Sequence, residues 1–460
     1  MYFFTKCGVI YIKTDVFYNN GMDILFSGIT VITMNEDIPV LFNAYVGISG
    51  QKIAYLGEKA PAESAARIID GSRRLLMPGL INSHSHLPMT LLRGYADDFS
   101  LQEWLFNHVL PAEGRLDERC IKAGIGLGIA ECLRFGVTSY TDMYFHLPRI
   151  AEAVLESGVK ANITNALVCL DMDNFDFEKD RGTQEIRQIL SSYKNSGGGR
   201  LEDGRLIVEA GIHAEYTSAP AAWQKSLAFA AENDLRMQIH LSETETEHNN
   251  CLKKYGKTPA EILNEYGVFS RKTTAAHCCW LNETDIDILA ANNVTAAHCP
   301  VSNLKLSAGI APVAKMLRRG VNVTLGTDGV CSNNNHDMFE EIKTAALLQK
   351  YIVGDPSVLP AYEALKLATV NGAAGQGREN ECGKISIGYD ADLIMLNLDA
   401  PHLFPLNDPC AAVVYAAKGS DVCLTMVRGK ILYENGEHKT IDMEKIRHEV
   451  ENYVLPLLKS

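Results

Sequence analysis

The feature that most constrains this chain is a long alternation of strand-like and helix-like runs between about residues 78 and 377. The strand-like runs are mostly continuous apolar segments, as expected for parallel strands that are buried on both faces. Eight such runs occur, namely LINSHSH, GVTSYTDMYF, VKANITNALVCL, RLIVEAGIHAEY, LRMQIHLS, KTTAAHC, NVTAAHC and VNVTLGTDG. Eight β–α units over roughly 250–300 residues predict an α/β fold, a closed (β/α)8 barrel of the TIM type.

Capping residues between these runs support the alternation. Thr258 and Glu261 have the spacing of a capping box, Pro259 stands at the first helical position, and Gly267 closes the helix. A second helix, predicted over 312–319, ends at Gly320.

Short strand patterns return on both sides of this region. Residues 23–57 read as strands with a hairpin turn at Gly50, and two further strand-like runs, KISIGYDADLIMLNL and VCLTMVRGKILYENG, follow residue 380. We therefore predict a small β-sandwich domain built from the N- and C-terminal segments. The predicted division is an N-terminal extension (1–21), the first β-sandwich segment (22–77), the barrel (78–377), the second β-sandwich segment (378–440) and a C-terminal helix (441–460).

Charge and cysteine usage narrow the class of protein. The 43 basic and 56 acidic residues give a formal charge of −13, and without a basic run the chain is a poor candidate for nucleic-acid binding. The sequence contains no stretch of about 18 uninterrupted apolar residues, so no membrane span is expected. Residues 1–21 lack the features of a signal peptide. Twelve cysteines without a C-x-x-C pair are typical of reduced thiols. We expect a cytoplasmic protein that assembles from identical subunits.

The first predicted barrel strand carries two histidines, His84 and His86, near its carboxyl end. Residues i and i+2 of a strand point to the same side, so both imidazoles face one point. Barrel active sites form at this end of the strands. On its own, however, the pair is a weak metal signal, since two polar residues on a surface strand would look the same.

The other strand ends strengthen the signal. Six of the 13 histidines fall at or near barrel strand ends, among them His213, His240, His277 and His298, and the eighth strand reaches Asp328. Imidazole and carboxylate together suit Zn²⁺ or a similar divalent ion, and Fe²⁺ or Mn²⁺ could occupy the same ligands. Three histidines and one aspartate, with water in the remaining position, would make an open catalytic site.

An acidic segment follows the fifth strand. Glu243, three residues after His240, enters the loop above the predicted site, where it can act as a proton shuttle. The competing interpretation is a helix-capping or solvated glutamate. That interpretation is fair for Glu245 and Glu247, and less so for Glu243.

Five segments, PGLINSHSH, HLSE, AHC, HCPVSNLKL and GTDG, resemble the amidohydrolase superfamily. More closely, they resemble its methylthioadenosine/S-adenosylhomocysteine deaminase branch, which includes 5′-deoxyadenosine deaminases. The resemblance runs from about Met22 to the last strands. It implies one zinc ion held by His84, His86, His240 and Asp328. Binuclear relatives carry a lysine near the end of strand 4, and VEAGIHAEYTS has none.

The resemblance also implies hydrolytic deamination of a small-molecule nucleoside of the adenosine type. In that reaction Asp328 would accept a proton from the zinc-activated water, His277 would orient the hydroxide, and Glu243 would protonate the purine N1. Glu113 and His213, with Glu243 and Asp328, would bind the substrate, Glu113 at the ribose hydroxyls and His213 at the purine. A solvated glutamate and a structural histidine are the competing interpretations.

The sequence offers few arginines that could bind a carboxylate of the substrate. Relatives that take S-adenosylhomocysteine can hold its carboxylate with arginines near the third strand, but NITNALVCL has none and Arg181 is the nearest candidate. A smaller 5′-substituent is therefore expected. Trp104 could wall the pocket or belong to the core.

The remaining residues of note near the strand ends are expected to have structural rather than catalytic roles. His298 is expected to shape the loop rather than bind metal. Gly326 and Gly329 are expected to permit a close backbone approach. Cys278 and Cys279 are expected to be buried thiols, not nucleophiles.

Three alternatives stay open from the sequence. The enzyme could deaminate another heterocycle, such as guanine, a pterin, cytosine or a chlorinated triazine. It could be a cyclic-amide hydrolase such as a dihydroorotase, which would normally need two metals and the bridging lysine. It could also be a metal-binding barrel without activity, although the presence of Glu243, His277 and Asp328 argues against this.

Overall fold

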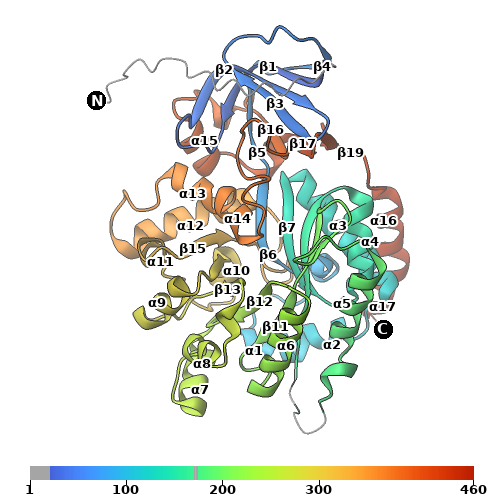
Figure 1. The fold of residues 1–460 in the computed structure, drawn as a ribbon, viewed down its shortest axis with the longest axis vertical. Helices are drawn as coiled ribbons and strands as arrows, with labels where there is room; N and C mark the ends of the chain where they lie inside the picture. Colours follow the sequence, from blue (N-terminus) through green and yellow to red (C-terminus); the bar gives the residue numbers. More distant parts are fainter. Residues whose placement is uncertain (1–20, 170, 172–174, 460) are drawn as a thin grey trace.

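A computed structural model describes residues 21–169, 171 and 175–459 (Figure 1). The predicted N-terminal extension therefore lies outside the described residues, apart from Gly21. A layer of helices surrounds the central parallel strands, and a separate sheet closes one end of the molecule. None of the described helices is long and apolar enough to cross a membrane.

The central strands fall into two five-stranded sheets. The first contains β6 (Leu80–Ser85), β7 (Val137–Tyr144), β8 (Lys160–Asn165), β10 (Leu206–Val208) and the antiparallel edge strand β9 (Arg200–Leu201). The second contains β11 (Ala210–Ala214), β12 (Met237–Leu241), β13 (Thr273–His277), β14 (Thr295–His298) and β15 (Asn322–Leu325). Every residue of β6, β7 and β8 is buried, which confirms the prediction of parallel strands covered on both faces.

The prediction of a single fourth strand over 205–216 is wrong. The chain changes sheets at Glu209: Val208 still pairs with β8, whereas Ala210 begins the ladder with β12. Glu209 is 1% exposed, and its carboxylate accepts hydrogen bonds from Asn162 Nδ2 and Gln238 Nε2, each at 2.6 Å. The break thus lies where a buried carboxylate must be satisfied from both sheets.

The predicted closed hydrogen-bonded barrel is also not formed among the described residues. Besides the break at Glu209, β15 and β6 share no regular ladder and meet through one bridge between Ser85 and Asp328. The backbones nevertheless approach closely, because Asp328 N–H donates to the His84 carbonyl at 3.0 Å. A Cβ on Gly326 would lie 2.8 Å from that carbonyl oxygen, which confirms the predicted close approach.

Both chain ends contribute to one nine-stranded sheet. Its path is β19–β18–β17–β16–β5–β1–β2–β3, with β4 paired to β1, and the antiparallel β5–β16 pair joins the two ends of the chain. The strands are β1 (Met22–Ile32), β2 (Val40–Ser49), β3 (Lys52–Gly57), β4 (Ala65–Asp70), β5 (Arg74–Pro78), β16 (Leu393–Asn397), β17 (Val422–Val427), β18 (Lys430–Glu434) and β19 (Glu437–His438). The hairpin at Gly50 is confirmed, with a φ of 56°.

Two helices have the predicted capping residues. The capping box of Thr258 and Glu261 is present at the start of α8, and α11 ends before Gly320, whose φ is 79°. The helical segments before β12 are η1 (Leu87–Leu92), α1 (Leu101–Glu103), η2 (Trp104–Val109), α2 (Leu110–Glu113), α3 (Glu118–Arg134), α4 (Leu147–Ser157), η3 (Phe177–Lys179), α5 (Arg181–Ser192) and α6 (Pro220–Glu232). Those after it are α7 (Glu245–Tyr255), α8 (Pro259–Glu265), η4 (Val268–Ser270), α9 (Glu283–Ala291), α10 (Pro300–Lys305), α11 (Val313–Arg318), α12 (Met338–Val353), α13 (Ala361–Leu367), α14 (Val370–Gly375), η5 (Pro401–Leu403), α15 (Pro409–Tyr415), η6 (Gly419–Asp421), α16 (Met443–Glu449), η7 (Val450–Val454) and α17 (Leu455–Lys459).

Candidate active site

Imidazoles from three strands meet at the carboxyl ends of the central sheets. His84 lies on β6, and its ring centroid is 4.9 Å from that of His86. From β12 and β13, the rings of His240 and His277 approach it to 4.8 and 5.3 Å. The structure thus brings together imidazoles that are nearly 200 residues apart in the sequence.

A single carboxylate joins this cluster. Asp328 Oδ1 lies 3.2 Å from His86 Nε2 and 3.6 Å from His84 Nε2. The hydroxyls of Ser302 and Ser332 donate to the other oxygen, Oδ2, at 2.7 and 3.0 Å. The two serines therefore occupy one side of the carboxylate and leave Oδ1 facing the imidazoles.

The hydrogen bonds of the histidines leave their Nε2 atoms available. His86 Nδ1 donates to the Met143 carbonyl at 2.6 Å, and His240 Nδ1 donates to the His213 carbonyl at 2.7 Å. An imidazole that donates through Nδ1 presents the lone pair of Nε2, as metal-binding histidines do. The Nε2 atoms of His86 and His240 are 3.4 Å apart.

His84 Nε2 completes the donor set. It is buried and has no hydrogen-bond partner among the described residues, which is costly unless a ligand satisfies it. The donor atoms of His84, His86 and His240 lie within 4.8 Å of one another. The donor atoms of His84, His277 and Asp328 form a second group within the same limit. Three imidazole nitrogens and one carboxylate oxygen at this spacing fit one divalent ion of the zinc type.

Glu243 stands beside the cluster, in the turn after β12. Its side chain is 6% exposed, and Oε1 lies 3.8 Å from His277 Nδ1, which itself donates to Asn303 Oδ1 at 2.8 Å. Burial raises the pKa of Glu243; His277 opposes this rise and Asp328 adds to it. A carboxyl group with a raised pKa keeps its proton closer to neutral pH, as a general acid requires.

Two further predicted residues flank the cluster. Glu113, on α2, accepts a hydrogen bond from the Tyr144 hydroxyl at 2.5 Å, and burial raises its pKa to about 7 although Tyr144 opposes the rise. His213, on β11, has Nδ1 2.9 Å from Thr217 Oγ1, and burial lowers its pKa to about 3. The imidazole of His213 is therefore neutral at physiological pH and can both donate and accept hydrogen bonds.

These groups open onto one cavity of about 350 Å³. Its polar wall includes Glu113, His213, Glu243, His277 and Asp328 together with His86 and His240. Trp104 lines the cavity although it is only 8% exposed, and Arg181 also lines it. A mostly apolar cavity with a few convergent polar groups is typical of a small-molecule site.

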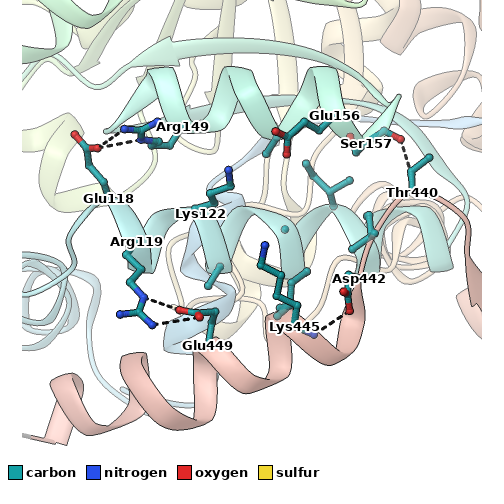
Figure 2. Close-up of a pocket in the computed structure, with 16 residues that line it drawn as sticks. Glu118, Arg119, Lys122, Arg149, Glu156, Ser157, Thr440, Asp442, Lys445 and Glu449 are labelled. Carbon is teal, nitrogen blue, oxygen red and sulfur yellow. Dashed lines mark hydrogen bonds and ion pairs between the residues drawn. The ribbon is translucent and has the colours of Figure 1, made fainter.

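A larger cleft of about 660 Å³ lies elsewhere, between α3, α4 and α16 (Figure 2). Ion pairs span its edges: Arg119 Nε lies 2.6 Å from Glu449, and Arg149 lies 2.9 Å from Glu118. None of the strand-end histidines lines it. The smaller cavity is therefore the candidate active site.

Three further strand-end residues, His298, Cys278 and Cys279, are buried near the site. His298 is buried and does not line the cavity, and its carbonyl accepts the Gly326 N–H at 3.0 Å. Cys278 and Cys279 are buried, and burial raises the pKa of both thiols. A thiol with a raised pKa is a poor nucleophile.

Sequence reasoning missed several residues around the site. Tyr144, Ser302 and Asn303 contact Glu113, Asp328 and His277 as described above. Of the two interpretations offered for Glu247, the solvated one is wrong, because Glu247 is 4% exposed; its carboxylate accepts backbone N–H groups just before α7, which is closer to the helix-capping one. The Thr244-x-x-Glu247 spacing was the only local signal that could have indicated a bound carboxylate.

The fold and this donor set define a metal-dependent hydrolase built on a TIM-type α/β architecture. The chain belongs to the amidohydrolase family, whose model matches residues 75–432.

Two relatives with named activities are similar to this chain over most of its length. The chain is 38% identical over 438 residues to the 5-methylthioadenosine/S-adenosylhomocysteine deaminase of Thermoanaerobacter pseudethanolicus, covering 95% of this chain and all of the relative. It is 41% identical over 413 residues to the 5′-deoxyadenosine deaminase of Methanothermobacter thermautotrophicus, covering 90% of this chain and 92% of the relative.

Solved structures agree in fold. An adenosine deaminase from Xanthomonas campestris with bound zinc has a TM-score of 0.89 and 30% identity, covering 96% of this chain and all of the other. The atrazine chlorohydrolase of Arthrobacter aurescens, complexed with zinc, has a TM-score of 0.83 and 25% identity, covering 95% of this chain and all of the other.

Proposed function

We propose that this protein is a zinc-dependent aminohydrolase that converts adenosine-type nucleosides to their inosine analogues and ammonia. The observation that carries the proposal is the cavity itself. One metal-binding cluster, a buried acid with a raised pKa (Glu243) and a buried carboxylate (Glu113) open onto the same 350 Å³ space. The named deaminase relatives, at about 40% identity, support the same reaction.

Each polar group has a role in this reaction. A zinc ion held by His84, His86, His240 and Asp328 would supply a water that is deprotonated near neutral pH. Glu243 donates a proton to the purine N1, which makes C6 electrophilic. Asp328 accepts one proton of the attacking water and passes it to the departing amine, and the proton left on the C6 hydroxyl returns to Glu243 as ammonia leaves; His277 orients the water.

Substrate binding follows from the two flanking residues. The Glu113 carboxylate accepts hydrogen bonds from the ribose 2′- and 3′-hydroxyls, and the neutral imidazole of His213 contacts the purine edge. A guanine, cytosine, pterin or triazine ring without a ribose would leave the buried Glu113 without these partners, which is costly. Glu113 therefore favours a nucleoside over the other heterocycles.

The activity is tested directly with purified protein and a substrate panel. Ammonia release and the absorbance change from adenosine to inosine are expected with 5′-deoxyadenosine, methylthioadenosine or adenosine. Turnover of a free base or a triazine, with no turnover of any adenosine-type nucleoside, would show that the proposed substrate class is wrong.

Replacement of Glu113 by glutamine is expected to raise KM for 5′-deoxyadenosine by roughly 10- to 100-fold, because hydrogen bonds to a charged group contribute about 1.5–3 kcal/mol. A 2′,3′-dideoxy analogue is the matched control, since it lacks the hydroxyls. The pKa of Glu113 near 7 adds a pH dependence. As pH falls below about 7 the carboxyl gains a proton and loses acceptor capacity, so wild-type KM should rise and KM of Glu113→Gln should stay flat. A KM that does not change in either measurement contradicts the role.

We also propose that an uncharged 5′-substituent is preferred. Arg181 lines the cavity, but its Nε already donates to Glu185 Oε1 at 2.8 Å. Apolar side chains, Phe106, Leu110 and Val168, form part of the same wall and are 42–45% exposed. A substrate carboxylate would have to compete with Glu185 for the guanidinium.

Methylthioadenosine and 5′-deoxyadenosine are therefore expected to have kcat/KM values about 10-fold or more above that of S-adenosylhomocysteine. Competition experiments with adenosine as the common reference would measure the ratio. A preference for S-adenosylhomocysteine would show that the proposal of an uncharged 5′-substituent is wrong.

Three further proposals concern the nine-stranded sheet, the cellular compartment and the assembly of subunits. We infer that the nine-stranded sheet folds as the small β-sandwich predicted from the sequence; its own hydrophobic core, which includes Phe26, Val46 and Leu424, supports this. Ten of the 11 described cysteines are buried, as is typical of reduced thiols, and this supports the proposal of a reducing, cytoplasmic setting. Assembly from identical subunits remains a prediction.

A further inference from the structure

The turn that carries Glu243 is held by another carboxylate. The backbone N–H of Ser242 donates to Glu247 Oε1 at 2.8 Å, and that of Glu243 donates to Glu247 Oε2 at 2.7 Å. Ser242 has a φ of 47°, which is a left-handed backbone conformation. Residues with a side chain rarely adopt this conformation unless the surrounding structure imposes it. The carbonyl of Ser242 is held as well, because the backbone N–H of Trp280 donates to it at 2.9 Å. The turn is thus fixed through its donors and its acceptor.

A second helix of this chain shows what the same local sequence does elsewhere. Thr258 and Glu261, at the start of α8, form an ordinary capping box, in which Glu261 accepts the Thr258 N–H at 2.8 Å. At the start of α7, Thr244 accepts the Glu247 N–H at 3.1 Å, which is the first half of that motif. The Glu247 carboxylate, however, reaches past Thr244 to the two residues before it.

The position of Glu247 separates it from the substrate. Glu247 is 4% exposed and is not part of the cavity wall, whereas Glu243 lines the cavity. No described contact joins Glu247 to the imidazoles or to Asp328. Glu247 therefore acts on Glu243 through the backbone of Ser242 and Glu243, and the two buried carboxyl groups also interact through their charges.

We infer that Glu247 is a positioning residue that holds the proton-donating Glu243 over the substrate through two backbone hydrogen bonds. The inference rests on the proposed function, since it assigns Glu247 a part in the same proton transfer. A general acid must lie within hydrogen-bond reach of the atom that it protonates, and displacement by about 1 Å can cost up to about 100-fold in rate.

The test is Glu247→Gln. Glutamine keeps the size of the side chain but offers one acceptor oxygen, so its NH₂ faces one of the two backbone donors. We expect kcat with 5′-deoxyadenosine to fall by roughly 10- to 100-fold, with KM within about threefold of wild type and zinc content unchanged. The matched control is Glu261→Gln, which removes the same charge at the start of α8; one amide oxygen can still accept the single Thr258 N–H there, so kcat should not change.

Two outcomes would overturn the inference: a wild-type kcat in Glu247→Gln, or a loss of kcat that Glu261→Gln shows equally. Glu247→Asp is the second variant, since it keeps the charge but is too short to reach both N–H groups; it should also lower kcat, and an unchanged kcat counts against the inference. The proposed function fails separately, if the wild-type protein itself deaminates none of the adenosine-type nucleosides.

Discussion

Replacement of Glu243 by glutamine is expected to lower kcat by roughly 10²- to 10⁴-fold, the usual contribution of a well-placed general acid. The amide keeps the shape of the side chain but has no proton to transfer. Because Glu243 does not belong to the donor set of the metal cluster, zinc content should stay at one ion per chain. Steady-state kinetics with 5′-deoxyadenosine and metal analysis of the same preparation measure both quantities.

Stability gives an independent readout for this variant. The pKa of Glu243 is raised in the folded protein, so at neutral pH the folded state holds its proton more tightly than the unfolded state and ionisation opposes folding. Above the unfolded pKa the carboxyl group therefore costs stability, and the neutral amide removes that cost. The melting temperature of Glu243→Gln at neutral pH should equal or exceed that of wild type.

The exposed neighbour Glu245 supplies the matched control, because Glu245→Gln removes the same charge two residues away without entering the cavity. Its kcat should remain at the wild-type value. Activity of Glu243→Gln at the wild-type value would show that another group protonates the substrate.

Removal of the metal is expected to abolish turnover, and one equivalent of Zn²⁺ per chain should restore it. Two groups that share His84, one of three imidazoles and one that includes Asp328, each have their donor atoms within 4.8 Å of one another, and His84 Nε2 has no hydrogen-bond partner among the described residues. An ion that binds only the folded state also stabilises it, by about 4 kcal/mol when its free concentration is 1,000 times Kd. Chelation should therefore lower the melting temperature as well as the rate.

Metal analysis and reconstitution test this expectation. Fe²⁺ and Mn²⁺, added in place of Zn²⁺, show whether other divalent ions support turnover in the same ligands. His240→Ala should lose both metal and activity, whereas His448→Ala, which changes an exposed helix residue, should keep both. Two ions per chain would point to a binuclear hydrolase, and full activity without metal would exclude the proposed chemistry.

Much of the site could be predicted because its residues stand at strand ends. The alternation of strands and helices places those ends at one edge of the central sheets, and the two-residue period of a strand predicts that His84 and His86 point to the same side. In the structure β6 ends at Ser85 and His86 stands one residue beyond it. These two rules need only local sequence and the fold class. They bring His240, His277 and Asp328 to the same place without any knowledge of the loops.

The fold was predicted less completely. A continuous apolar run over 205–216 favours one strand, and only the hydrogen bonds of the buried Glu209 show that the chain changes sheets there. The predicted barrel ladder is interrupted there and a second time between β15 and β6, which meet only through the bridge of Ser85 and Asp328. Which edges of neighbouring strands pair depends on side chains that meet across the interior, and no local pattern encodes those meetings.

The sequence by itself determined the class of chemistry, because metal-binding residue types at successive strand ends leave few other interpretations. Only the tertiary structure decided which side chains hold those residues in place. Tyr144 on Glu113, Asn303 on His277 and Glu247 on the turn of Glu243 are contacts between segments whose separation is set by packing. A hydrogen bond depends on distances of tenths of an ångström, whereas a sequence pattern specifies only which face of an element a residue occupies.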